Sequence, residues 1–170
     1  MSDDGSTFLA LALLGRPRVV VLDEPTTGLD PESRRAVWGI VRDLVAGGAA
    51  VVLTTHHLEE AEELADRIAI LRAGLVVLSG TPEEISATQP ATIRFTVPEG
   101  APPLPRLAGV RIERTAPQVE LSTFALQPTL TQLLTWAGEH DLELQGLQAR
   151  AASLEQAFLA VADGAVPTAA

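Results

Sequence analysis

Two adjacent carboxylates and a more distant histidine are the side chains whose types and spacing could do chemistry. Asp23 and Glu24 directly follow four aliphatic residues, and His56 follows a second aliphatic run and two threonines. One carboxylate can anchor Mg²⁺ while its neighbour orients a water, which is part of what phosphoryl transfer to water requires. Taken alone, an acidic pair is more often solvated and a lone histidine more often structural. The residues therefore indicate this chemistry only together with their surroundings.

The surroundings of the acidic pair predict the end of a strand. Residues 19–22 are branched and apolar, which is typical of a fully buried strand in a parallel sheet. Ligands of open α/β sheets bind at the carboxyl ends of such strands. Pro25 ends the strand because it has no N–H to donate, Gly28 permits a positive φ, and Asp30 begins the next helix.

The first part of the chain, residues 1–89, alternates between predicted strands and helices. This alternation favours an α/β domain with a mainly parallel sheet. Among its helical residues, the glutamates that follow His57 are expected to form a solvated face: Glu59, Glu60, Glu62 and Glu63. Helices are expected at residues 8–15, 31–45 and 58–65 and shortly after Thr81, which has Glu84 at the capping-box position, and further strands at 50–53, 67–71 and 75–79.

The second part, residues 90–170, changes in texture and predicts a small α+β appendage. A proline-rich connector, residues 98–105, interrupts it. Trp136, like Trp38 in the first part, is expected to be a packing residue, and His140 a solvated surface histidine. We expect strands at 91–97, 110–114, 119–124 and 142–147, and helices at 128–136 and 154–162.

Composition excludes several classes of function. The chain has 170 residues, is 46% hydrophobic and carries a net charge of −10, which argues against binding nucleic acid or anionic lipid through bulk electrostatics. There is no cysteine, hence no disulfide framework and no thiol chemistry. Residues 1–7 are polar and acidic, unlike a signal peptide, and the apolar run that follows is shorter than the roughly 20 residues that span a bilayer.

Two stretches resemble a known family. RVVVLDEPTTGLD (residues 18–30) closely resembles the Walker B strand and D-loop of ABC-transporter ATP-binding subunits, and VVLTTHHLEEAEELADRIAIL (residues 51–71) resembles their switch-histidine region. The resemblance implies that Asp23 holds Mg²⁺ through water, that Glu24 polarises the attacking water and that Asp30 reports across a dimer interface. It also implies that His56 contacts the γ-phosphate, with His57 at a variable position. The two histidines would exchange roles if the strand ended one residue later.

Other motifs of the family are missing from the sequence. There is no G-x-x-x-x-G-K-[ST] loop and no Q-loop, and MSDDGST stands where a signature of the LSGGQ type is expected. The ending SLEQAFLAVADG (residues 153–164) is similar to the tail of drug- and polyketide-exporter ATP-binding subunits. The resemblance therefore implies a partial P-loop NTPase core, residues 1–89, followed by a C-terminal α+β accessory domain, residues 90–170.

The function implied is that of an ATP-binding and ATP-hydrolysing subunit of an ABC exporter, present as a truncated C-terminal portion. ATP and Mg²⁺ are the implied cofactors, although we expect weak or no binding by this chain alone. The implied partners are a membrane-spanning permease and a second ATP-binding subunit, without nucleic acid, on the inner face of the cell membrane. Two alternatives are a half-site completed by another polypeptide and a non-catalytic interaction or regulatory module. The joint presence of Asp23, Glu24, Asp30 and His56 argues against the last.

Overall fold

The computed structural model describes residues 17–115 and 117–164 of the chain. Its contacts divide the chain into two compact units, residues 1–68 and residues 69–170. The helix expected at residues 8–15 lies outside the described residues. The domain boundary expected between residues 89 and 90 stays a prediction, and each unit is described by itself below.

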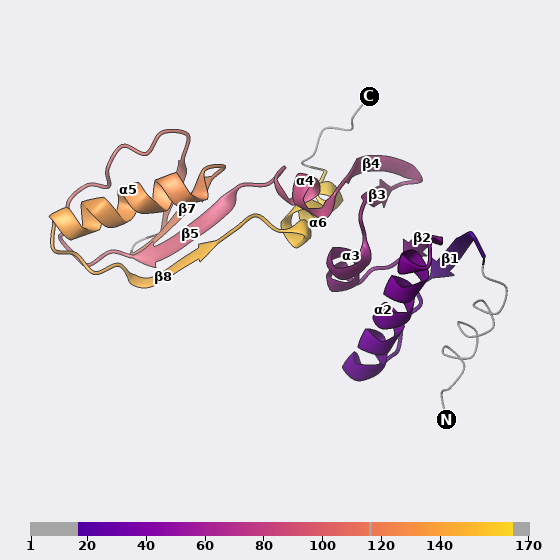
Figure 1. Ribbon diagram of the computed structural model, residues 1–170. Helices are drawn as coiled ribbons and strands as arrows, with labels where there is room; N and C mark the ends of the chain where they lie inside the picture. Colours follow the sequence, from indigo (N-terminus) through magenta and orange to yellow (C-terminus); the bar gives the residue numbers. More distant parts are fainter. Residues whose placement is uncertain (1–16, 116, 165–170) are drawn as a thin grey trace. The chain divides into compact units, whose positions relative to one another are not determined.

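The described residues of the first unit form a two-stranded parallel sheet with two helices (Figure 1). The parallel pairing and the expected helix after Asp30 are both confirmed. Asp30 caps that helix and Pro31 occupies its first turn, where a missing N–H costs nothing. The elements in chain order are β1 (Val19–Asp23), α2 (Pro31–Ala46), β2 (Ala50–Thr54) and α3 (Leu58–Leu64).

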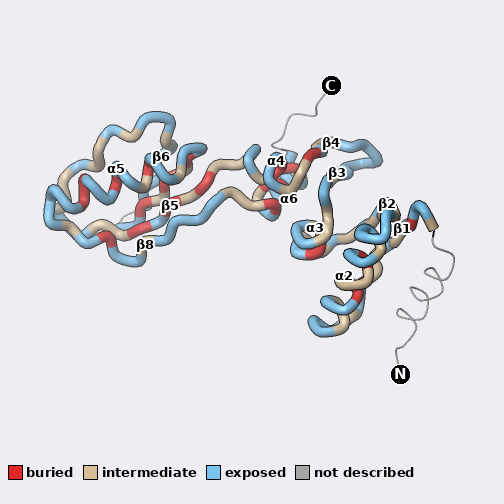
Figure 2. Tube along the Cα trace, viewed as in Figure 1, coloured by how far each residue is buried: buried red, intermediate tan, exposed pale blue. Residues whose placement is uncertain are grey.

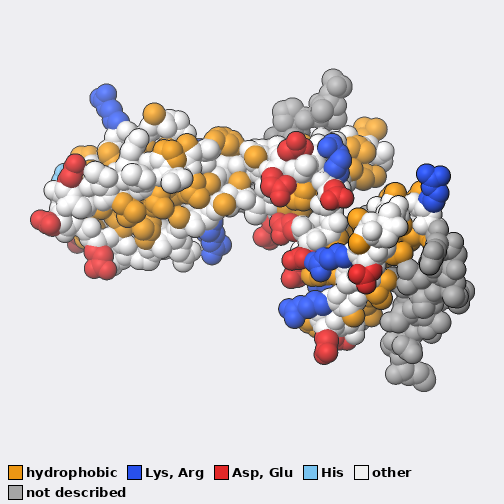
Figure 3. Space-filling view, in the orientation of Figure 1, with side chains coloured by type: hydrophobic (Ala, Val, Ile, Leu, Met, Phe, Trp, Pro, Cys, Tyr) orange, Lys and Arg blue, Asp and Glu red, His pale blue; other side chains and the backbone are white. Residues whose placement is uncertain are grey.

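Helix α2 covers one face of the β1–β2 sheet. Its Val37 and Val41 are buried against partly buried residues that include Leu22 and Val51. On the other face Val21 is 70% exposed, so the expectation of a fully buried strand is wrong. The reason is that the described elements cover this sheet on one side only, so β1 alternates between covered and open positions. Hydrophobic side chains accordingly reach the surface of this unit (Figure 3).

The contact between α2 and α3 includes a buried carboxylate. Glu60 is fully buried, and its Oε1 accepts a hydrogen bond from Nε1 of Trp38 at 3.0 Å. Glu60 therefore does not belong to the solvated face predicted for α3, because the indole of α2 gives it a partner. Glu59, Glu62 and Glu63 are exposed as expected, and Trp38 is buried as expected.

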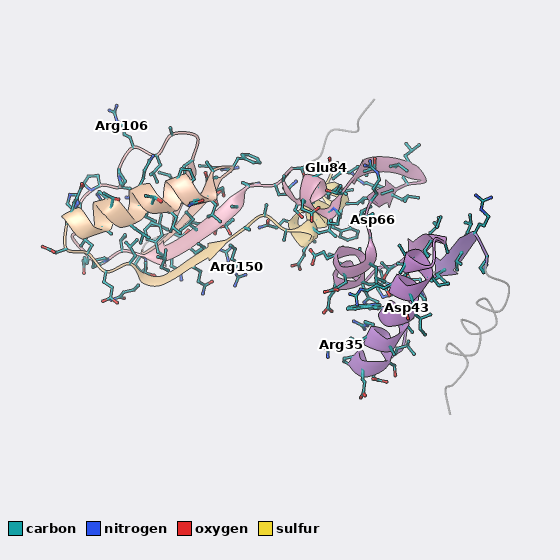
Figure 4. All side chains as sticks on the ribbon, viewed as in Figure 1. Arg35, Asp43, Asp66, Glu84, Arg106 and Arg150 are labelled. Carbon is teal, nitrogen blue, oxygen red and sulfur yellow. The ribbon has the colours of Figure 1, made fainter. Side chains whose placement is uncertain are left out.

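The second unit begins with a β-hairpin followed by a short helix. Strands β3 (Ile68–Arg72) and β4 (Leu75–Gly80) are joined by Ala73 and Gly74, which both have positive φ. Helix α4 (Pro82–Ser86) has the expected capping box: Thr81 and Glu84 exchange hydrogen bonds with each other's backbone. Glu84 is labelled in Figure 4.

The last helix among the described residues, α6 (Leu154–Ala162), packs against α4 although the two are far apart in sequence. Ser153 caps it through a second capping box with Gln156. The helix presents Leu154, Ala157 and Val161 to the interior, and α4 contributes Ile85, which is 1% exposed. The segment that the sequence predicted as residues 154–162 is thus confirmed, and its apolar face has a partner.

Between α4 and α6 the chain forms a four-stranded antiparallel sheet in the order β6-β7-β5-β8. Helix α5 (Leu126–Glu139) covers one face, where Ile93, Leu121 and Leu133 are fully buried (Figure 2). The opposite face is polar and carries the ion pair between Arg94 and Glu120. The strands are β5 (Ala91–Thr96), β6 (Arg111–Thr115), β7 (Gln118–Thr123) and β8 (Gln145–Arg150).

One strand of this sheet is displaced from its expected place. The sequence predicts a strand at residues 142–147, whereas β8 begins three residues later, at Gln145. Leu142 and Leu144 pack into the core under α5 from the preceding loop. The apolar side chains of Leu142 and Leu144 are therefore explained by burial in the core and not by an extended strand. Trp136 is buried as expected, and the exposed His140 has its Nδ1 2.8 Å from the carbonyl oxygen of Trp136.

Candidate functional site

The carboxyl ends of β1 and β2 bring the predicted site residues of the first unit together. The two strands are parallel and in register, so that Asp23 of β1 lies opposite Thr54 of β2. Glu24 continues from β1, and His56 follows two residues after Thr54. Residues separated by some thirty positions in sequence thus meet at one edge of the sheet, where open α/β folds bind ligands.

Two side chains meet the carboxylate of Glu24 at the same oxygen. Nδ1 of His56 lies 2.5 Å from Oε2 of Glu24, and the hydroxyl of Thr27 donates to that oxygen at 2.8 Å. The side chains of His56 and Glu24 remain 60% and 38% exposed, respectively. The pair is therefore held in place and still open to a ligand from solvent.

The backbone of Glu24 is in an unusual conformation. Its φ is 49°, in the left-handed region, which costs a non-glycine residue on the order of 1 kcal/mol. Its N–H donates to the carbonyl oxygen of Thr54 at 3.0 Å. This bond continues the ladder between the strands by one residue and holds the strained turn in place.

Asp23 is tied to the neighbouring strand through its side chain. The hydroxyl of Thr54 donates to Oδ1 of Asp23, and the same oxygen of Thr54 lies 3.2 Å from the N–H of Glu24. Sequence reasoning singled out neither Thr54 nor Thr27. The register of β1 against β2 would have pointed to Thr54, because it sets a hydroxyl opposite the carboxylate.

Asp30 lies at the start of α2, where it acts as the N-cap. Its carboxylate accepts from the N–H groups of Glu32 and Ser33 at 2.9 and 3.0 Å and from the hydroxyl of Ser33 at 2.6 Å. The hydroxyl of Ser33, followed by the backbone bonds, lowers the pKa of Asp30 below its ordinary value of 3.8. Gly28 has the expected positive φ of 78°. The role of Asp30 at a dimer interface stays a prediction.

The two adjacent histidines differ in what they touch. His56 reaches Glu24, whereas the backbone N–H of His57 donates to the hydroxyl of Thr55 at 2.9 Å. His57 also occupies the position before α3, and the two imidazole centroids are 4.1 Å apart. Of the two histidines, His56 is therefore the one whose side chain contacts Glu24, and its role at the γ-phosphate stays a prediction.

The oxygen donors of the site suit Mg²⁺ as a partial ligand set. No group of three or more metal-binding side chains occurs among residues 17–115 and 117–164. Mg²⁺ commonly takes only one or two carboxylates and completes its shell with waters and phosphate oxygens, so Asp23 fits as a single anchor. For the nucleotide, the strand ends supply carboxylates, a hydroxyl and an imidazole. The sequence contains no phosphate-cradling loop of the P-loop type.

Comparisons with known proteins match both parts of the chain. Residues 91–153 match the family model of ABC transporter domain-containing protein-like, C-terminal domain, and residues 6–62 match that of AAA domain, putative AbiEii toxin, Type IV TA system. The daunorubicin/doxorubicin resistance ATP-binding protein DrrA of Streptomyces peucetius is 36% identical over 90% of this chain. The resemblance to ABC-transporter ATP-binding subunits is confirmed.

Two further relatives match a shorter part of the chain at higher identity. The daunorubicin resistance ATP-binding protein DrrA3 of Streptomyces coeruleorubidus is 56% identical over 46% of this chain and 25% of its own length. The Nod factor export ATP-binding protein I of Rhizobium johnstonii is 47% identical over 48% of this chain and 26% of its own length. The chain spans 49% of the length of the Streptomyces peucetius protein. Within the described residues, the helices are too short or too polar to cross a bilayer.

Proposed function

We propose that this chain belongs to the ATP-binding subunit of an ABC exporter and supplies the water-activating edge of its nucleotide site. The observation that carries the proposal is the contact between Glu24 and His56 at 2.5 Å, at the ends of two adjacent parallel strands. A carboxylate held by an imidazole and a hydroxyl is oriented to accept a proton from water. The similarity to ATP-binding proteins of drug resistance and Nod factor export supports the same assignment.

Each site residue has a role in this proposal. Asp23 holds Mg²⁺ through water, and the metal ion, when bound, neutralises charge on the phosphates. Glu24 acts as the general base, and His56 orients Glu24 and contacts the γ-phosphate. Asp30, on the loop that leads into α2, reports across the interface with a second subunit. Residues 1–89 form the catalytic portion and residues 90–170 an accessory domain.

The partners follow from the proposed subunit. A membrane-spanning permease would hold the chain at the cytoplasmic face of the cell membrane and choose the transported substrate, and a second ATP-binding subunit would complete the dimer. The net charge of −10 supports a protein partner rather than nucleic acid.

The chain by itself should bind Mg-ATP weakly or not at all. Phosphate affinity in P-loop proteins comes from backbone N–H groups and a lysine, which are not encoded here. Isothermal titration of the purified chain with Mg-ATP measures this directly. Micromolar binding by a monomer would contradict the expectation, whereas binding that appears only with a second, P-loop-bearing polypeptide would favour the half-site alternative.

The catalytic proposal is tested by Glu24→Gln in the ATP-hydrolysing assembly that contains this chain. We expect ATP turnover to fall by roughly 100-fold to 10,000-fold with ATP binding preserved, because the amide keeps the shape but cannot act as a base. Glu62→Gln, which changes an exposed carboxylate on α3, is the matched control. Turnover within a few-fold of the parent would count against Glu24 as the base and favour the non-catalytic alternative.

A further inference from the structure

Thr54 is the side chain that joins the two carboxylates of the site. Its hydroxyl donates to Oδ1 of Asp23 and lies 3.2 Å from the N–H of Glu24, from which it accepts. Its carbonyl oxygen accepts from the same N–H at 3.0 Å. One residue of β2 thus holds a carboxylate of β1 and the strained turn that follows it.

The strand pairing explains why Thr54 can do this. Parallel partners in register point their side chains to the same face of the sheet, and Thr54 is the partner of Asp23. A β-branched side chain has few χ1 rotamers, so its hydroxyl has a restricted direction. The contacts that Thr54 makes with Asp23 and Glu24, called the clamp below, are therefore built on paired strands. Paired strands hold side chains more rigidly than loops do.

We propose that Thr54 is a positioning residue that fixes Asp23 and Glu24 in the arrangement that ATP hydrolysis requires. The proposal rests on the function proposed above. Because the hydroxyl of Thr54 occupies Oδ1 of Asp23, Oδ2 is the oxygen that would be left for a metal-bound water. Because Thr54 also accepts from the N–H of Glu24, it supports the left-handed backbone from which the Glu24 carboxylate meets His56.

A simpler role for Thr54 is that of a good strand-forming residue at an exposed strand end. Valine has the same shape and an equal preference for strands but no hydroxyl, whereas serine keeps the hydroxyl and loses the branch. If Thr54 only forms strand, Thr54→Val is harmless and Thr54→Ser is the damaging change. If Thr54 positions the carboxylates, the order is reversed.

The first test needs no catalysis and uses the purified chain. Three-bond NMR couplings report the χ1 rotamer of Asp23 in the parent, in Thr54→Ser and in Thr54→Val. We expect one rotamer in the parent and in the serine variant, and averaged couplings in the valine variant. Thr55→Val is the matched control, because the hydroxyl of Thr55 contacts the N–H of His57 instead, and it should leave Asp23 in one rotamer. Averaged couplings in the parent itself, or a single rotamer in Thr54→Val, would overturn the proposal.

The second test measures turnover in the ATP-hydrolysing assembly that contains this chain. Thr54→Val should lower kcat by about tenfold to a hundredfold, the effect of losing a charge-assisted hydrogen bond, with KM within about threefold. Thr54→Ser should keep kcat within about threefold of the parent. Equal losses in both variants, or full activity in the valine variant, would overturn the positioning role. A parent assembly without ATPase activity would instead contradict the proposed function, and the rotamer test would still decide whether the clamp exists.

Discussion

At the scale of single residues, Glu24 is constrained at both its backbone and its carboxylate. The ring of His56 and the hydroxyl of Thr27 both meet Oε2 of Glu24, so Oε1 is the oxygen that can face a water. A glutamine at this position would keep its oxygen toward the hydroxyl of Thr27, because an amide nitrogen cannot accept from it. The substitution would therefore present an NH₂ group to the water, which blocks the base and also reverses the polarity of the site.

Asp30 offers a pH-dependent test of the cap on α2. Its pKa is depressed in the folded chain, so the cap contributes stability that is present above the ordinary value of 3.8 and lost as pH falls through the lower folded value. Asn caps helices about as well as Asp but does not titrate. We expect Asp30→Asn to flatten the loss of unfolding free energy that the parent shows as the pH falls from about 5 through 3.8 and below.

Urea denaturation at several pH values measures this effect. Asp30→Ala is the control, because alanine removes the cap at every pH and should lower the urea midpoint at neutral pH as well. An Asp30→Asn variant whose stability falls with acid as steeply as that of the parent would contradict the assignment.

The candidate site residues could be predicted from the sequence, whereas the residues that hold them in place could not. Asp23, Glu24 and His56 were predicted because the longer stretches that contain them resemble ABC-transporter motifs, and the structure brings these residues to one edge of the sheet. Thr27 and Thr54 were missed because a hydroxyl near a strand end is common in any sheet. Their importance arises from the register of two strands, which a single sequence does not encode locally.

At the scale of elements, helices α2 and α3 are joined by a polar contact inside an apolar interface. Glu60 is buried, with Trp38 Nε1 as donor to one oxygen, and its Oε2 has no partner among the described residues. The sequence placed Glu60 on a solvated face because glutamates normally lie there. Tertiary packing overrode that preference. It also explains the wrong strand prediction at Leu142 and Leu144, which are apolar because they pack into the core from a loop.

Replacing Trp38 by Phe should separate the hydrogen bond from the packing. We expect Trp38→Phe to lower the free energy of unfolding by about 2 kcal/mol, because it leaves a buried carboxylate without its donor. Combining it with Glu60→Met should recover part of this loss, since an apolar side chain needs no partner. Chemical denaturation of the purified chain measures both effects.

Trp136→Phe is the matched control for this experiment. Trp136 is equally buried, and its indole N–H donates no hydrogen bond within the part of the chain that the structure describes. It should therefore show only the cost of the smaller ring, and the rescue should be absent. A double variant less stable than Trp38→Phe would contradict the role of Glu60.

At the scale of the whole molecule, the four-stranded sheet separates α4 from α6 in sequence, although these two helices pack against each other. In chain order the first strand of this sheet is β5 and the last is β8, and these two strands pair, with Thr92 opposite Arg150. The chain therefore enters and leaves the sheet at nearly the same point (Figure 4). The family match to residues 91–153 covers this sheet and stops before α6. Residues 91–150, which make up most of the proposed accessory domain of residues 90–170, thus form an insertion whose two ends are close together.

This arrangement predicts that the sheet can be removed without separating α4 from α6. Replacing residues 91–150 with a short Gly-Ser linker should preserve the α4–α6 contact, because strand partners lie only about 5 Å apart. Leu154→Ala should then destabilise both the parent and the shortened chain by about 3 kcal/mol, as expected for a buried leucine.

Leu159→Ala, on the exposed side of α6, should change little in either background. Urea denaturation of the four variants measures these differences. If Leu154→Ala has no effect in the shortened chain, α6 depends on the sheet for its position rather than on α4.

The pairing of α4 with α6 also has a consequence during synthesis. The ribosome releases α4 early and α6 only after the entire sheet. The apolar side chain of Ile85 therefore stays exposed until α6 has been synthesised and packs against it. Closing this long loop is entropically costly and slow compared with local contacts. A nascent chain stopped just before Ser153 would contain a complete four-stranded sheet. It would still expose the apolar surface of α4, including Ile85, to chaperones and proteases.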